Sequence, residues 1–204
     1  MPRRIAIIGA GSVGAALTTG LAGVGHDVRV GVRAPDDPKH DALRSQATVT
    51  TLAEASTGAE VVILAVPADA VEASIAALDL GAGQVLLDAA NAVRQPVPGG
   101  HDTVGDLTAS LLPEGVSLAK AFNTIGAEHM VGARPDGTRP FLPLAGDDDA
   151  TAVAQELADG LGFDTVVVGD RSAFHHLEAH AALWIHLAFA CGWGRNFAFE
   201  VVRR

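Results

Sequence analysis

Short apolar runs alternate with amphipathic segments along most of the chain. Arg4–Ile8 is a mainly apolar run that stops at a glycine, a pattern typical of a strand buried on both faces. Residues 12–25 carry apolar positions on one helical stripe and end in a glycine that suits a helix stop. The same reasoning predicts strands at 28–32, 48–51, 60–66, 84–88, 117–122, 140–145 and 164–168, and helices at 71–78, at 149–161 and over most of the chain from residue 172.

This alternation predicts an α/β fold: a Rossmann-type, doubly wound and mostly parallel sheet with a short helical C-terminal extension. With 204 residues the chain suits one domain with a modest appendage. We expect the sheet domain to span residues 1–170 and the extension to span residues 171–204. The longest apolar stretch, residues 181–193, is too short to cross a bilayer, which takes roughly 20 residues, so we expect a buried helix there.

A glycine-rich loop follows the first predicted strand and opens the first predicted helix. It reads Gly-Ala-Gly-Ser-Val-Gly and fits the pattern G-x-G-x-x-G. In this setting glycines allow a tight turn, the approach of a pyrophosphate and close helix–strand packing, while the helix N-terminus attracts the phosphates. A glycine turn without a ligand is the alternative, and the context favours a dinucleotide. The expected contacts are Gly9, Ala10, Gly11, Ser12, Val13 and Gly14.

The end of the second predicted strand indicates which dinucleotide binds. NAD proteins usually carry Asp or Glu there for the ribose hydroxyls, but this segment reads Val-Gly-Val-Arg and has no carboxylate in register. Arg33 is placed to meet a 2′-phosphate, next to Val32 and with Lys39 as a second cation. A solvated Arg33 is the alternative. The sequence therefore favours NADP over NAD.

The ends of the later strands are expected to converge on the nicotinamide side of the dinucleotide, because ligands of such sheets lie at the carboxyl ends of the strands. Small residues there let a flat ring lie against the backbone. Asn91 and Asn123 suit hydrogen bonds to the carboxamide or the ribose, although asparagine also caps ordinary turns. The expected contacts are Ala65, Val66, Pro67, Ala89, Asn91 and Asn123.

Composition narrows the classes of function. The formal net charge of -10 argues against a nucleic-acid partner, and the absence of tyrosine excludes a tyrosine acid. A single cysteine, Cys191, cannot form an intrachain disulfide, which favours a reducing cytoplasm. We therefore expect a small-molecule partner and neither a nucleic acid nor a membrane.

These segments together resemble the NADP oxidoreductase, coenzyme F-420-dependent family, whose domain also occurs in the cytoplasmic part of six-transmembrane metalloreductases. The resemblance implies hydride transfer between NADP(H) and a deazaflavin or flavin-type ring stacked over the nicotinamide, with the protein aligning two cofactors. Val32 departs from the family pattern, which often has Ser or Thr at this position. The matching segments are residues 9–14, 31–33, 65–67, 120–124 (Lys-Ala-Phe-Asn-Thr), 146–148 and 183–188 (Leu-Trp-Ile-His-Leu-Ala).

Few other residues offer catalytic chemistry. Lys120 next to the expected ring site could donate a proton or form a structural salt bridge, and His180 is the other weak candidate. The C-terminal histidines are expected to line the acceptor pocket, to form a subunit contact or to lie on a helix surface rather than to bind a metal. Residues 147–149, three aspartates before a helix, suit N-capping. Two arginines, Arg134 and Arg139, could meet an acidic coenzyme tail or be solvated. The histidines are His175, His176, His180 and His186.

Three functions remain open from the sequence. The first is an NADPH-dependent oxidoreductase with a deazaflavin (F-420) or flavin acceptor. The second is an NADPH-dependent reductase of a small carbonyl or imine substrate, which requires a proton donor beside the nicotinamide. The third is a non-enzymatic NADP-binding module. The apolar C-terminal helix also predicts a homodimer that completes the acceptor pocket.

Overall fold

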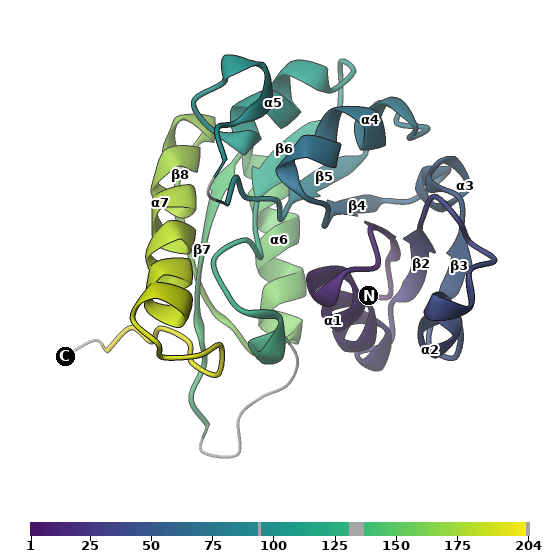
Figure 1. Ribbon diagram of the computed structural model, residues 1–204. Coiled ribbons are helices and arrows are strands. Elements are labelled where there is room, and N and C mark those ends of the chain that lie inside the picture. The colour runs from purple at the N-terminus through teal and green to yellow at the C-terminus, as the bar shows by residue number, and fades with distance from the viewer. Residues whose placement is uncertain (94, 131–136, 203–204) are drawn as a thin grey trace.

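The computed structural model describes residues 1–93, 95–130 and 137–202. One sheet of eight strands crosses the molecule in the order β3-β2-β1-β4-β5-β6-β7-β8 (Figure 1). Neighbouring strands are parallel except for β6 and β7, which are antiparallel. The strands are β1 (Arg4–Ile8), β2 (Asp27–Gly31), β3 (Thr48–Thr50), β4 (Val61–Leu64), β5 (Val85–Asp88), β6 (Ser117–Lys120), β7 (Phe141–Gly146) and β8 (Asp164–Gly169).

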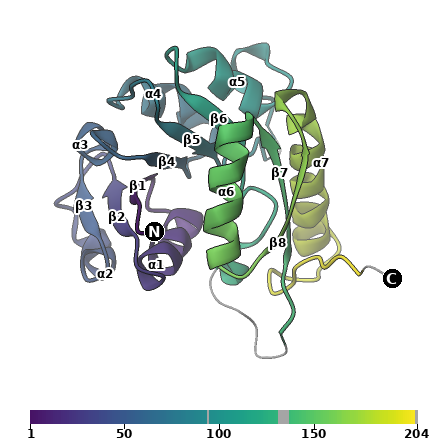
Figure 2. The same ribbon diagram turned by 180° about the vertical axis from the view of Figure 1, so that it is seen from behind.

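Helices cover both faces of the sheet (Figures 1 and 2). One buried cluster joins Leu17 of the first helix and Leu157 of the sixth to one face, and another joins Ile75 and Phe174 to the opposite face. The fold is therefore the predicted doubly wound, mostly parallel α/β sheet. The helices are α1 (Ser12–Gly23), α2 (Asp41–Arg44), α3 (Leu52–Ser56), α4 (Val71–Ala76), α5 (Val104–Leu111), α6 (Asp148–Gly160) and α7 (Phe174–Ile185).

The C-terminal part differs from the prediction of a mostly helical tail. After α7 a π-helical segment, His186–Ala190, ends at Cys191, and residues 191–202 have no helix or strand. Gly192 and Gly194 take positive φ angles of 73° and 72°, which turn the chain back. The chain then runs beside β7, where the Phe141 backbone N–H donates to the Phe199 carbonyl at 2.8 Å. The apolar stretch at 181–193 is thus helical as far as Ala190, but the prediction of a buried helix is wrong in part, because Leu183, Phe189 and Trp193 are exposed.

The C-terminal helix α7 packs directly on the sheet domain. Phe174 and Leu177 are buried in the same cluster as the cores of β4 and β5. A Cβ atom at Gly105 of α5 would lie 2.4 Å from the Phe174 ring, so glycine is required for this close helix contact. The proposed boundary between residues 170 and 171 stays a prediction. Among the described residues, no helix combines the length and hydrophobicity that a membrane span requires.

Candidate active site

The glycine loop joins β1 to α1 at the carboxyl edge of the sheet. Gly9 has a φ of 105°, and a Cβ atom there would lie 2.4 Å from the Ala65 carbonyl oxygen of the β4 end. A Cβ atom at Gly14 would lie 2.0 Å from the Gly9 carbonyl oxygen. Both glycines are therefore required by the protein's own packing, the first for the turn and the second for the helix–strand contact.

Gly11 differs from its two neighbours. It is exposed, it precedes α1 with an ordinary φ of -71°, and a Cβ atom added to it would meet nothing within 4 Å. The first turn of α1 has no acidic residue and no side-chain cap. Its free N–H groups and the open space in front of Gly11 form the cradle that a pyrophosphate fills in dinucleotide-binding folds. The residues present therefore fit the expected cofactor.

The end of β2 presents Arg33 as an exposed side chain at the same edge. The Asp37 carboxylate of the following loop is engaged elsewhere, because it caps a short helical turn and pairs with Lys39 at 2.8 Å. The hydrogen bonds from Lys39 are the main reason that the pKa of Asp37 lies below its ordinary value. Lys39 thus lies near Arg33 in the sequence, but its ammonium is paired with a carboxylate.

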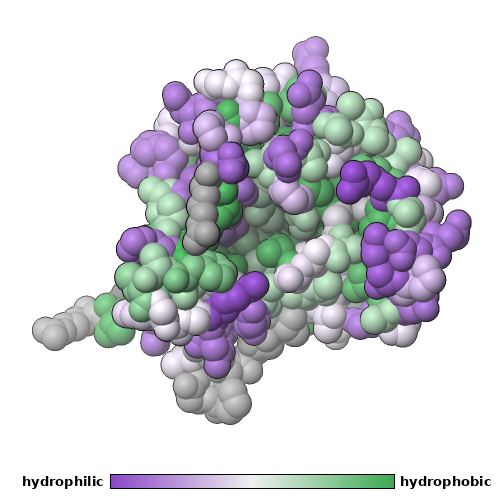
Figure 3. Space-filling view, in the orientation of Figure 1, coloured by the Kyte–Doolittle hydropathy of each residue, from purple (hydrophilic) through white to green (hydrophobic). Residues whose placement is uncertain are grey.

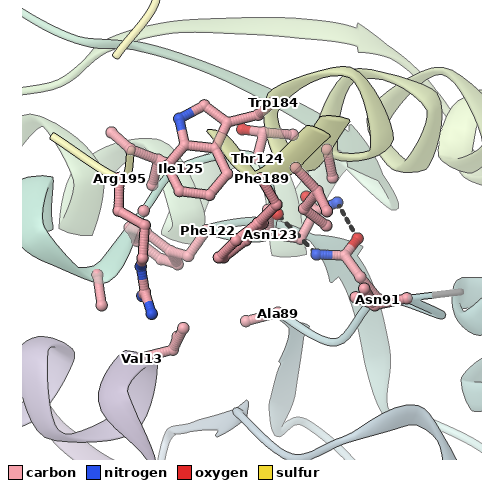
Figure 4. A pocket seen from close by; sticks show the side chains of 15 residues that line it. Val13, Ala89, Asn91, Phe122, Asn123, Thr124, Ile125, Trp184, Phe189 and Arg195 are labelled. Carbon is pink, nitrogen blue, oxygen red and sulfur yellow. Dashed lines mark hydrogen bonds between the residues drawn. The ribbon is translucent and has the colours of Figure 1, made fainter. Parts of the chain in front are cut away.

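A cavity of about 430 Å³ opens beyond the ends of β5 and β6 and is walled on its far side by α7 and the C-terminal segment. The face in Figure 3 is hollowed near its centre, and Figure 4 shows the lining side chains. Most of its surface is apolar. Its described lining residues are Val13, Ala89, Asn91, Val93, Phe122, Asn123, Thr124, Ile125, Gly126, Ala127, Ala181, Trp184, Ile185, Phe189 and Arg195.

Asn91 and Asn123 lie on adjacent strand ends and are hydrogen-bonded to each other (Figure 4). Asn123 Nδ2 donates to Asn91 Oδ1 at 3.0 Å, and Asn91 Nδ2 donates to the Asn123 carbonyl at 2.7 Å. This arrangement fixes the Asn123 amide and leaves its Oδ1 buried without a hydrogen-bond partner. The Thr124 hydroxyl is also buried and has no hydrogen-bond partner. A buried acceptor of this kind favours a ligand that presents an N–H or O–H donor.

Phe122 shapes the floor of the cavity. It is fully buried, and its φ of 61° is the only positive value among the described residues other than glycine. A bulky residue in this region is strained, and such strain gathers at functional sites. The left-handed turn comes directly after β6, and the ring packs edge-on against Phe163 at 6.2 Å. The turn therefore comes just before Asn123, the next lining residue.

Lys120 is held in a buried ionic network. Its Nζ lies 2.9 Å from Asp88 Oδ2 and 2.9 Å from Glu178 Oε1, and it donates to the Ala90 carbonyl at 2.9 Å. All three ammonium donors thus have an acceptor. Lys120 and Asp88 have no exposed surface, and neither lines the cavity. The geometry supports the structural salt bridge, which ties the end of β5 to α7; a proton-donor role for Lys120 stays a prediction.

The C-terminal histidines do not line the cavity. The rings of His175 and His176 lie 3.8 Å apart on the exposed side of α7, tilted by 45°, and His186 is exposed. His180 lies between two aromatic rings, 5.8 Å from Phe141 and 4.8 Å from Phe199, and burial lowers its pKa. Over the described ranges, no group of three His, Cys, Asp or Glu side chains is placed to hold a metal ion.

Asp147, which precedes α6, and Arg139 make structural contacts. Asp147 takes the N-cap position but makes no capping bond; its carboxylate accepts from the Leu118 N–H at 2.8 Å and pairs with Arg171. The Arg171 hydrogen bond is the main reason that the pKa of Asp147 lies below its ordinary value. Arg139 pairs with Asp159 at 3.0 Å, whereas Arg134 lies outside the described residues.

Comparison with known proteins supports the resemblance over the first part of the chain. Residues 4–92 match the sequence profile of the family described as NADP oxidoreductase coenzyme F420-dependent. The match covers β1 to β5 and therefore includes both the glycine loop and Arg33. The resemblance inferred from the sequence is confirmed over these residues, and the matching family is one of NADP oxidoreductases.

Individual relatives extend the likeness beyond residue 92. A structure assigned as an F420-dependent NADP-reductase from Arthrobacter sp. FB24 is 27% identical with a TM-score of 0.82, covering 98% of this chain and 100% of the other. Metalloreductase STEAP3 of Rattus norvegicus is 30% identical over 178 residues, 86% of this chain. The chain spans 36% of that relative's length. An imine reductase from Aspergillus terreus is 20% identical with a TM-score of 0.70, and the match covers 95% of this chain and 64% of the reductase chain. This likeness shows a shared fold.

The family site expected from the sequence is brought together only in part. Four of the expected contacts, Val13, Ala89, Asn91 and Asn123, line one cavity. The rest of the glycine loop, Arg33 and the β4 end lie at the carboxyl ends of β1, β2 and β4, outside that lining. Sequence reasoning missed part of the lining as candidate contacts: Phe122, Thr124, Ile125, Phe189 and Arg195.

Proposed function

We propose that the protein transfers a hydride between NADP(H) and a flat deazaflavin or flavin-type ring. The observation that carries this proposal is the apolar cavity of about 430 Å³, which extends from Val13 in the first turn of α1 to Trp184 and Phe189 at the C-terminal end. A dinucleotide whose pyrophosphate lies at the glycine loop directs its nicotinamide into this cavity. The remaining apolar space suits a second flat ring.

The chain's own residues would bind and orient both rings. When bound, NADPH supplies the hydride. Ala89 offers a small surface for the nicotinamide, and the unpartnered Asn123 Oδ1 suits the N–H of its carboxamide. Trp184 and Phe189 line the acceptor side with apolar surface. Holding two reactants in line in an apolar site is the main contribution that such a protein makes to rate.

The cavity lining also bears on the carbonyl or imine reductase alternative. That chemistry requires a proton donor beside the nicotinamide. The described lining residues include no Asp, Glu, His or Lys, and neither Lys120 nor His180 is among them. Hydride transfer to a flavin-type ring leaves an anion that the ring delocalises and that takes its proton from water, so it requires no acid from the protein. The cavity therefore favours the ring acceptor.

The proposal is tested by mixing the protein anaerobically with NADPH and, in turn, oxidised F-420, FMN and a panel of carbonyl compounds. The absorbance of the reduced nicotinamide should fall with F-420 or FMN. Turnover with carbonyls alone would establish the carbonyl reductase alternative instead. Turnover with none of them while NADPH still binds would identify a binding module.

Gly11→Val tests where the pyrophosphate binds. Its Cβ atom meets no other atom and its φ suits any residue, so the variant should fold, with a loss of no more than about 1 kcal/mol because valine is a poorer N-cap than glycine. Its side chain fills the expected pyrophosphate space, so we expect the Kd for NADPH to rise at least about tenfold, the loss of roughly 1.4 kcal/mol of binding. Calorimetric binding and thermal unfolding measure the two effects. A Gly11→Val protein that binds NADPH like the wild type would contradict the placement.

We also propose a homodimer in which the partner covers the mouth of the cavity. Leu183, Phe189 and Trp193 are large apolar side chains exposed close together in the sequence, and Phe189 also lines the cavity. Light scattering at micromolar concentration should give twice the chain mass of 20.8 kDa. A monomer would contradict this assembly. The cytoplasmic location stays a prediction.

A further inference from the structure

Arg195 is the only charged side chain among the described residues that line the cavity. It comes from the C-terminal segment, opposite Val13 in the first turn of α1. Figure 4 shows its guanidinium extending toward the side of the cavity that Val13 forms, away from the Asn91–Asn123 pair. A single cation in an apolar cavity, in a chain with a net charge of -10, suits an anionic group of a ligand.

The segment that carries Arg195 is fixed on both sides of it. The Gly194 N–H donates to the Ala188 carbonyl at 3.1 Å, which anchors the preceding turn to the π-helical segment. Trp184 Nε1 donates to the Phe197 carbonyl at 3.1 Å, and the two rings stack at 5.1 Å. Arg195 therefore reaches the cavity from a defined position rather than from a free tail.

The Arg195 guanidinium uses only part of its hydrogen-bond donors in its ion pair. Its Nε lies 2.9 Å from Glu128 Oε1, and both side chains are about two-fifths exposed. Exposed pairs of this kind are weak, so Arg195 can exchange or share this carboxylate at little cost. The terminal nitrogens retain a planar fork that matches a phosphate in bidentate geometry. Glu128 thus holds the guanidinium at the rim of the cavity without occupying all of it.

We propose that Arg195 binds a phosphate group of a ligand in the cavity. This inference rests on the proposed function, because a dinucleotide bound at the glycine loop places its pyrophosphate at the first turn of α1, on the Val13 side. The helix N-terminus and Arg195 then hold the phosphate from two sides. A phosphate on the side chain of a flavin-type acceptor has the same chemistry, and the two sources are separated by experiment.

The test compares Arg195→Gln with Arg139→Gln, a matched loss of one exposed, ion-paired arginine that does not line the cavity. Calorimetry of the full chain at low ionic strength gives the Kd for NADPH, for FMN and for riboflavin, which lacks the phosphate. We expect Arg195→Gln to raise the Kd for NADPH about tenfold, as for one lost charged hydrogen bond. Arg139→Gln should change it less than about twofold.

A third variant checks the competition with the carboxylate. Glu128→Gln removes the charge that faces Arg195, so it should leave the guanidinium freer and lower the Kd for NADPH about twofold. A larger Kd for FMN but not for riboflavin or NADPH in Arg195→Gln would support the proposal with the acceptor as the source of the phosphate. Equal Kd values in Arg195→Gln and Arg139→Gln for all three ligands would overturn it. A wild type that binds no NADPH would instead overturn the proposed function.

Discussion

Replacing Lys120 with methionine should lower the free energy of unfolding by about 3–5 kcal/mol, the range for removing one partner of a buried ion pair. The ammonium is fully buried and is 2.9 Å from both Asp88 and Glu178. Methionine fills much of the volume but leaves two carboxylates facing each other with no cation between them. The loss should therefore exceed that from an ordinary core substitution.

Urea unfolding followed by circular dichroism measures this effect. Lys39→Met serves as the control, because Lys39 also pairs with an aspartate at 2.8 Å but is 64% exposed. That control should lose less than about 1 kcal/mol. Should Lys120→Met prove too unstable to purify, Glu178→Gln keeps a hydrogen-bonding oxygen and should lose part of the stability. Equal losses in Lys120→Met and Lys39→Met would show that the buried network contributes nothing beyond a surface pair.

Replacing Arg33 with alanine should raise the Kd for NADPH about 10- to 100-fold, as for one or two lost charged hydrogen bonds, and change the Kd for NADH little. Arg33 is exposed at the end of β2, and Asp37 in the following loop is paired with Lys39. The 2′-phosphate distinguishes the two dinucleotides, so its partner should affect only one of them.

Fluorescence titration with both dinucleotides provides the measurement, and Lys39→Ala provides the comparison. Because the Lys39 ammonium already pairs with Asp37, Lys39→Ala should raise the Kd for NADPH by a smaller factor than Arg33→Ala does. An equal rise in the Kd for NADPH and for NADH in Arg33→Ala would show that Arg33 does not contact the 2′-phosphate. Arg33 would then be a solvated surface residue.

The sheet could be predicted from the sequence because buried parallel strands leave a strong local signal. Arg4–Ile8 has the bounds that its pattern predicts, and the other strands agree to within two residues. The short helices α3 and α5 were missed although each begins with a capping box, Thr51 with Glu54 and Thr103 with Asp106. The spacing of these caps is a signal that sequence analysis could have used.

The site was predictable only where the fold itself brings residues together. Strand ends of a parallel sheet meet at one edge, so Asn91 and Asn123 could be paired from their positions alone. Arg195 enters the cavity because Gly192 and Gly194 reverse the chain after α7, a path that no local pattern specifies. The left-handed φ of Phe122 likewise depends on packing around the end of β6. These features come from tertiary structure, not from periodicity.

The central claim is that one carboxyl-edge site holds NADP with its nicotinamide in the apolar cavity. A crystal structure of the protein with NADP tests it most directly. The account predicts the pyrophosphate in front of Gly11, the 2′-phosphate at Arg33 and the nicotinamide against Ala89, with its carboxamide N–H donating to Asn123 Oδ1. A nicotinamide bound outside the cavity, with Asn123 Oδ1 still unpartnered, would contradict it.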